Sequence, residues 1–276
     1  MAGTLYLVGT PIGNLSDFSP RAVETLEGAD FIAAEDTRVT LKLLNHFGIK
    51  KQLVSYYEHN RAESGEKIIS RLLAGENCAL VSDAGMPAIS DPGEDLVRQC
   101  AEQGITVVVV PGPSAVVSAV ALSGLPTGRF TFEGFLSTAK KSRKEHLESL
   151  RDERRTMVFY EAPHKLVQTL KDMNEAFGGD RKIAVCRELT KLYEETVRTT
   201  LADALAMYEE NPPRGEFVLV VDGAPEKKAE SMGMDEAVAM VLKLKDDGLS
   251  LKDASKRVSE MSGLNRKTLY DAALKK

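Results

Sequence analysis

Short apolar runs alternate with longer amphipathic stretches along the first 110 residues of the chain. Such runs are typical of buried strands, and they lie at residues 5–8, 31–34, 53–56, 79–81 and 105–110. Ser19-Pro20 supplies an N-cap followed by proline at the first helical position, while Gly48 and Gly75 follow helical runs as stop signals. Strands that alternate with helices predict βαβ units and a mostly parallel five-stranded sheet.

A second set of apolar runs follows a turn-rich segment at residues 124–128, which we interpret as a domain boundary. A helix is predicted just before it, at residues 114–122, and the runs lie at residues 130–135, 157–160, 183–186, 194–199 and 217–221. Too few residues separate Cys186 from Glu194 for a crossover helix, so some of these strands pair antiparallel. This pattern predicts a second α/β domain with a mixed sheet.

The C-terminal part of the chain has the pattern of a small helical module. Residues 224–230 are charged and poor in apolar side chains, as in a linker, and amphipathic helices are predicted at residues 235–245, 251–261 and 266–274. Turns at Gly248 and Gly263 join them. This arrangement fits a helix-turn-helix or a generic capping bundle. The predicted domains are therefore residues 1–123, 124–223 and 232–276.

Composition narrows the class of protein. The chain has 276 residues, 43% of them hydrophobic, which is enough for several packed cores. It contains no apolar run long enough to span a membrane and no basic N-terminal leader, so we expect a soluble, cytoplasmic protein. Its three cysteines are scattered among apolar neighbours, as buried thiols are, and its four histidines share no ligand spacing. No metal is expected.

The distribution of charge is more informative than its sum. The formal net charge is −5, but residues 231–276 hold nine Lys and Arg against seven Asp and Glu, which is +2 and leaves −7 for the rest. An acidic protein is not expected to hold nucleic acid by bulk electrostatics alone. The sequence instead predicts a mildly basic module attached to an acidic body.

Candidate chemistry lies in four loops that follow predicted strands. They are rich in glycine and proline, which let the backbone approach a ligand closely and rigidly, and they span residues 9–14, 82–87, 111–115 and 160–164. In open α/β sheets, ligands bind outside the carboxyl ends of strands, so these loops predict a small-molecule cleft. The sequence lacks G-x-x-x-x-G-K-[ST], a G-x-G-x-x-G after the first strand, and G-x-S-x-G, which disfavours P-loop enzymes, dinucleotide enzymes and serine hydrolases.

Several stretches in order along the chain resemble one family. They are LYLVGTPIGN (5–14), AEDTR (34–38), SDAGMPAISDPG (82–93), PGPSA (111–115), FL (135–136), FYEAPH (159–164) and RELTK (187–191). The chain is similar in these stretches to ribosomal RNA small subunit methyltransferase I, the 2'-O-ribose cytidine methyltransferases of the tetrapyrrole methylase superfamily. Met86 stands where the family more usually has threonine.

The resemblance implies a tetrapyrrole-methylase-like fold of two α/β domains with a small C-terminal helical module. It also implies a homodimer that binds S-adenosylmethionine between the domains and methylates a cytidine of small-subunit (16S) ribosomal RNA near the decoding centre. The residues that it assigns to the cofactor are Thr10, Pro11, Asp83, Ala84, Gly85, Met86, Ile89, Pro113, Ser114, Ala115, Tyr160, Glu161 and Glu216.

The catalytic candidates are basic and acidic residues of the same stretches, because a ribose hydroxyl is a weak acid that a positioned base or cation can help to react. They are Glu35, Asp36, Arg38, Glu161 and Arg187. Several of the cofactor and catalytic candidates have structural alternatives. Asp83 could brace its own loop, Asp36 and Ser114 could cap helices, and Glu161 could form an ion pair with Arg187 or Lys191.

The candidate RNA contacts are clusters of Lys and Arg, which neutralise backbone phosphates. They are Lys140, Lys141, Arg143 and Lys144 on a predicted loop after a strand, and Lys252, Lys256, Arg257, Arg266 and Lys267 in the C-terminal module. A short charge run is more often a solvated face. The alternatives left open are a methylase of the same fold that acts on a tetrapyrrole or the diphthamide precursor, and a non-catalytic RNA-binding ribosome assembly factor.

Overall fold

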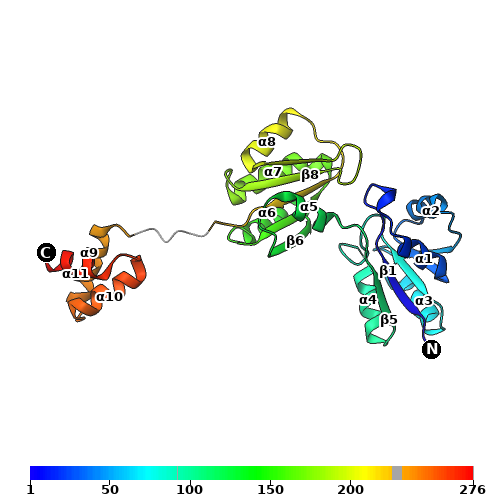
Figure 1. The fold of residues 1–276 in the computed structure, drawn as a ribbon, viewed down its shortest axis with the longest axis horizontal. Helices are drawn as coiled ribbons and strands as arrows, with labels where there is room; N and C mark the ends of the chain where they lie inside the picture. The colour runs from blue at the N-terminus through cyan, green and yellow to red at the C-terminus, as the bar shows by residue number, and fades with distance from the viewer. Residues whose placement is uncertain (92, 226–231, 276) are drawn as a thin grey trace. The chain divides into compact units, whose positions relative to one another are not determined.

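The structure of the chain is a computed structural model that describes residues 1–91, 93–225 and 232–275. It forms two compact units, Met1–Ala224 and Pro225–Lys276, and Figure 1 shows the elements of each. Most of the segment predicted as a linker, residues 226–230, lies outside the described residues.

The first unit begins with a parallel five-stranded sheet, as predicted. Its strands follow the order β3-β2-β4-β1-β5, and all four pairings are parallel. They are β1 (Thr4–Val8), β2 (Phe31–Ala34), β3 (Gln52–Ser55), β4 (Cys78–Val81) and β5 (Thr106–Val110). Because β1 lies between β4 and β5, the loops that follow these three strands leave the same edge of the sheet side by side.

Helices cover both faces of this sheet, so its strands are apolar on both sides. One core joins α1 (Pro20–Gly28) and α2 (Thr37–His46) to the sheet through side chains such as Leu26 and Leu44. The other joins α3 (Arg61–Leu73) and α4 (Gly93–Glu102) through Ile68 and Leu96. A short 3₁₀ helix, η1 (Leu15–Asp17), precedes α1.

A second five-stranded sheet follows in the same unit, and it is mixed, as predicted. Its order is β6-β7-β10-β8-β9, with β6 and β7 parallel and the other pairs antiparallel. The strands are β6 (Phe130–Phe135), β7 (Thr156–Glu161), β8 (Lys182–Arg187), β9 (Glu195–Thr200) and β10 (Phe217–Val221). The short turn between β8 and β9 forms the antiparallel pair expected from the spacing of Cys186 and Glu194.

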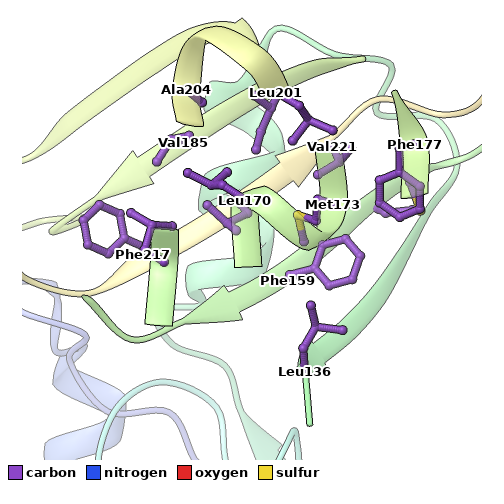
Figure 2. Packing of buried hydrophobic residues seen from close by; sticks show 14 of the residues in the cluster. Leu136, Phe159, Leu170, Met173, Phe177, Val185, Leu201, Ala204, Phe217 and Val221 are labelled. Atoms are coloured by element: carbon purple, nitrogen blue, oxygen red, sulfur yellow. The ribbon is translucent and has the colours of Figure 1, made fainter. Parts of the chain in front are cut away.

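Helices also cover this second sheet. The core in Figure 2 packs α6 (Lys140–Ser149), α7 (Pro163–Phe177) and α8 (Leu201–Glu210) against one face, and Phe159, Leu170 and Val221 are among its buried residues. The helix α5 (Ala115–Ser123) packs Val116 and Val120 against side chains of the opposite set on β7, β8 and β10. Since α5 belongs to this second core, the change between cores precedes it, rather than following it at residues 124–128 as predicted.

The second unit contains three helices, close to the predicted ranges. They are α9 (Met234–Asp246), α10 (Leu251–Ser262) and α11 (Arg266–Leu274), and they share a core that includes Val241, Val258 and Leu269. Gly263 ends α10 in the left-handed region with φ of 73°, which a glycine adopts without strain. Within the described parts of the chain, no helix is long and apolar enough to cross a membrane.

Candidate active site

Three of the four predicted loops meet at the edge of the first sheet. The loops after β1 and β4 are joined by a short antiparallel bridge, in which Thr10 N–H donates to the Gly85 carbonyl at 2.9 Å and Gly85 N–H donates to the Thr10 carbonyl at 3.2 Å. The buried Thr10 hydroxyl also donates to the Ser82 carbonyl at 3.2 Å. Gly85 has φ of 90°, so the bridge needs a glycine there.

The loops after β1 and β5 approach so closely that only glycines fit between them. A Cβ on Gly9 would lie 2.7 Å from Gly112 Cα and 2.7 Å from Met86 Sδ. A Cβ on Gly112 would lie 2.8 Å from the Gly9 carbonyl oxygen. This contact holds the three loops together as one rigid backbone surface.

A cavity of about 530 Å³ opens beside these loops, and the second sheet supplies its other side. Seven of the residues predicted for the cofactor line it, namely Asp83, Ala84, Ile89, Ala115, Tyr160, Glu161 and Glu216. Thr10 and Pro11 line a neighbouring cavity of about 360 Å³, which shares Ser82 and Asp83 with the first. The fourth predicted loop is represented by Tyr160, Glu161, Ala162 and Pro163.

The other four residues predicted for the cofactor are not part of the lining of either cavity. Gly85 forms the bridge to Thr10, and Met86 packs its sulfur against Gly9. Ser114 occupies the N-cap position of α5, as its structural alternative predicted, but its side chain makes no capping hydrogen bond. Pro113 lies directly before it, with its carbonyl oxygen 3.5 Å from where a Cβ of Gly85 would lie.

Carboxylates gather on the side of the cavity formed by the first sheet. Burial, and after it the charges of Asp83 and Asp91, raise the pKa of Glu35 above its usual value. Burial likewise raises the pKa of Asp83. Asp83 Oδ1 accepts a hydrogen bond from the Asp36 N–H at 3.0 Å, so it braces the loop after β2 rather than its own loop. The cavity therefore presents concentrated negative charge to a ligand.

Asp36 and Arg38 engage each other instead of the cavity. Asp36 caps α2 by accepting the Arg38 N–H at 2.8 Å, as its structural alternative predicted. Its other oxygen lies 2.6 Å from Arg38 Nη2. These contacts with Arg38 lower the pKa of Asp36 to about 2. Glu35 is thus the predicted catalytic residue of this segment that lines the cavity.

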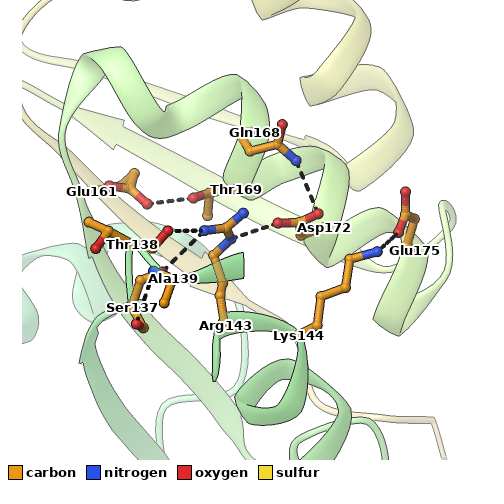
Figure 3. A network of polar contacts seen from close by, with 10 residues as sticks. All are labelled: Ser137, Thr138, Ala139, Arg143, Lys144, Glu161, Gln168, Thr169, Asp172 and Glu175. Carbon is orange, nitrogen blue, oxygen red and sulfur yellow. Dashed lines mark hydrogen bonds and ion pairs between the residues drawn. The ribbon is translucent and has the colours of Figure 1, made fainter. Parts of the chain in front are cut away.

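Glu161 ends β7 and is buried at the wall of the cavity. Its Oε1 accepts the Ala162 N–H at 2.8 Å. Its Oε2 accepts the Thr169 hydroxyl at 2.5 Å (Figure 3). The expected ion pair with Arg187 or Lys191 is therefore wrong for Glu161. Neutral donors fix its carboxylate and leave its charge facing the cavity.

The predicted cations of this region pair with other acids. Arg187 Nε lies 3.2 Å from Glu195 Oε2, outside the cavity lining. Lys191 Nζ lies 2.8 Å from Glu188 Oε1 and 3.0 Å from Glu216 Oε2. Its hydrogen bond lowers the pKa of Glu188.

The predicted basic loop after β6 is wrong in form, because Lys140, Lys141, Arg143 and Lys144 belong to the helix α6. The three lysines are exposed, but Arg143 is buried and lies 2.6 Å from Asp172 through its Nε. It is therefore not an exposed surface cation like the three lysines. In the second unit, the predicted RNA contacts Lys252, Lys256, Arg257, Arg266 and Lys267 are all exposed.

Sequence reasoning missed several residues that line the cavity. Ser90, Asp91 and Leu189 lie within stretches that carried the resemblance, so the signal was present but was not assigned. Phe135 lies in the stretch FL (135–136) of the same resemblance and was not assigned either. Val218 gave no signal of its own, because it lies on a strand as an ordinary apolar residue. Across the described residues, no group of three or more His, Cys, Asp or Glu could hold a metal ion.

Comparisons with known proteins agree on this architecture. Residues 4–205 match the family model of Tetrapyrrole (Corrin/Porphyrin) Methylases, and residues 233–276 match that of the RsmI C-terminal HTH domain. A protein of Synechocystis sp. named "Ribosomal RNA small subunit methyltransferase I" is 48% identical over 99% of this chain and 98% of its own. A protein of the same name from Pseudomonas aeruginosa is 46% identical over 100% and 98%.

Solved structures support the fold at lower identity. Uroporphyrin-III-C-methyltransferase of Thermus thermophilus has a TM-score of 0.56 at 21% identity, covering 79% of this chain and 94% of its own. A diphthine synthase has a TM-score of 0.60 at 14% identity, covering 80% and 90%. At these identities the likeness concerns the fold alone.

Proposed function

Because the chain belongs to the ribosomal RNA small subunit methyltransferase I family of tetrapyrrole methylases, we propose that it methylates RNA of the small ribosomal subunit. The methyl donor is S-adenosylmethionine. The finer proposal is that the acceptor is the ribose 2'-oxygen of a cytidine near the decoding centre, and that the enzyme works as a cytoplasmic homodimer. These finer points rest on the motifs shared with the family.

The residues of the 530 Å³ cavity fit S-adenosylmethionine in size and chemistry. The donor is a cation with an apolar adenosine part, and the cavity combines carboxylates with apolar surface from Ile89, Phe135 and Tyr160. Glu35, Asp83 and Asp91 would hold the positive charge, and the rigid backbone of the joined loops would position the rest. When bound, this donor supplies a methyl group on a positively charged sulfur, which is a good leaving group.

For the acceptor, the structure favours two of the five predicted catalytic residues. Glu35 and Glu161 line the cavity, whereas Asp36, Arg38 and Arg187 are paired elsewhere. A carboxylate with a raised pKa is a stronger base, which favours Glu35 for accepting a proton from a hydroxyl. Glu161, held by Thr169, suits the orientation of that hydroxyl by accepting its hydrogen bond. We assign most of the acceleration of methyl transfer to the positioning of the acceptor hydroxyl against the methyl donor.

The helical second unit supports RNA over a small acceptor. A tetrapyrrole needs no separate helical module, and the uroporphyrin-III-C-methyltransferase structure matches in fold alone. The match of residues 233–276 to a helix-turn-helix domain, together with the five exposed cations on α10 and α11, supports contacts to backbone phosphates. The earlier alternative of a capping bundle is thereby disfavoured.

The observation that carries the proposal is the carboxylate-lined cavity at the joined ends of β4, β1 and β5. It is tested by incubating the protein with radiolabelled S-adenosylmethionine and small subunits from a strain that lacks the gene. We expect label in the RNA, and we expect Asp83→Ala to weaken donor binding in calorimetry. A wild-type protein that binds no donor would support the non-catalytic assembly factor instead.

A further inference from the structure

A third cavity, of about 250 Å³, adjoins Glu161, which lines both this cavity and the one proposed for S-adenosylmethionine. Its remaining lining comes from the segment between β6 and α6, from Arg143 of α6 and from the first turns of α7. The polar members are Ser137, Thr138, Arg143, His164, Lys165, Gln168 and Thr169. The reaction as described above uses none of these except Thr169.

Arg143 is held so that part of its guanidinium stays free. Its side chain is 11% exposed, its Nε lies 2.6 Å from Asp172 Oδ2, and its Nη1 donates to the carbonyls of Ser137 and Thr138 at 3.1 and 3.2 Å. No hydrogen bond among the described residues uses Nη2, and Figure 3 shows the unbridged nitrogen on the side of Thr169. A rigid arginine with a free N–H at a polar cavity suits an oxyanion.

The charges at the starts of α6 and α7 point to the same kind of ligand. The N-terminus of a helix carries partial positive charge and is stabilised by acids, not by cations. Neither first turn contains an acid, and neither N-cap residue, Ala139 or Ala162, makes a side-chain cap. The first turn of α7 instead carries His164 and Lys165, which line the cavity. An anion bound between the helix N-termini and these side chains would interact favourably with both, where they now lie unfavourably beside each other.

We propose that this cavity binds a backbone phosphate of the acceptor RNA. The inference rests on the proposed function and adds the place at which the acceptor RNA is held. The charges of Arg143 and Asp172 offset each other, and both oxygens of Glu161 already accept hydrogen bonds from neutral donors. The donors left for the phosphate are therefore Arg143 Nη2 and Lys165, whose positive charge also offsets that of Glu161. Since Glu161 lines both cavities, a ribose hydroxyl of the same nucleotide lies within reach of the methyl donor.

Lys165→Gln tests the site, with Lys171→Gln as the matched control, because Lys171 is an exposed lysine of the same helix outside the cavity lining. We expect Lys165→Gln to raise the KM for small subunits about tenfold while kcat and donor affinity stay within about twofold. The slope of log KM against log salt concentration should fall by about 0.7 to 1, as for one lost phosphate contact. If both variants behave alike while the wild type methylates RNA, the phosphate site is wrong and the proposed function stands.

A second measurement tests the phosphate site even if the wild type transfers no methyl group to RNA. Inorganic phosphate is titrated into protein with ¹⁵N-labelled histidine, and the four imidazole signals are followed by NMR. We expect the His164 signal to move in the wild type and in Lys171→Gln, and to stay in Lys165→Gln. A His164 signal that phosphate leaves unchanged in the wild type would overturn the site, whatever the RNA assay shows.

Discussion

The contact between Gly9 and Gly112 predicts a sharp effect of one added methyl group. In Gly112→Ala, the new Cβ would lie 2.8 to 2.9 Å from the carbonyl oxygen, carbonyl carbon and Cα of Gly9, all of them backbone atoms that cannot rotate away. The loops after β1 and β5 must therefore part. Overpacking of this kind costs about 1–3 kcal/mol of the free energy of unfolding. The same displacement moves the bridge between Thr10 and Gly85, which shapes the cofactor cavity.

The assay compares Gly112→Ala with Gly28→Ala, because a Cβ on Gly28 would meet no atom within 4 Å. Urea unfolding measures stability, and calorimetry measures the Kd for S-adenosylmethionine. We expect Gly112→Ala to lower the unfolding midpoint and to raise the Kd about tenfold, which corresponds to about 1.4 kcal/mol. Gly28→Ala should change neither quantity in that direction. If the two variants match in both measurements, the joined loops do not shape the donor site.

Three further predictions concern buried charge, pH and the C-terminal unit. Arg143→Met leaves Asp172 buried and unpaired, so it should lower the free energy of unfolding by about 3–5 kcal/mol, whereas Arg98→Met, at an exposed pair, should cost less than about 1 kcal/mol in the same urea titration. Glu35→Gln should raise the unfolding midpoint near neutral pH, because burial raises the pKa of Glu35 and its charged form therefore destabilises the fold. This gain in stability should vanish below the usual pKa of 4.5, where Glu35 is protonated in both the folded and the unfolded state. A gain that persists there would refute this reasoning. Truncation after Ala224 should spare donor binding in calorimetry and impair RNA methylation; full RNA activity would exclude a role for the second unit.

The alternation of apolar runs and helix signals was enough to predict the two sheets and the three C-terminal helices. These features depend on local periodicity and on short spacings, which a sequence contains. The boundary between the cores was placed wrongly, because the apolar α5 shows no preferred face and its sheet is chosen by packing. Likewise, Arg143 looked like one of four surface cations, although helix formation turns it inward toward Asp172.

The candidate site was likewise predictable in part. Glycine and proline loops at strand ends predicted the cavity, because the parallel sheet brings the ends of β4, β1 and β5 to one edge. The partners of its charged groups could not be predicted. Asp83 reaches the Asp36 backbone, and Glu161 reaches Thr169 instead of a cation, because those contacts depend on distances between elements.

The central claim is tested most directly by locating the methyl group that the protein adds. Small subunits from a strain lacking the gene are incubated with the protein and labelled S-adenosylmethionine, and the RNA is then hydrolysed with alkali. A 2'-O-methyl group blocks cleavage at its own nucleotide, so we predict label in one alkali-resistant dinucleotide that begins with cytidine. Label on a base, or in mononucleotides only, would contradict 2'-O-ribose methylation, and RNA without label would contradict the account as a whole.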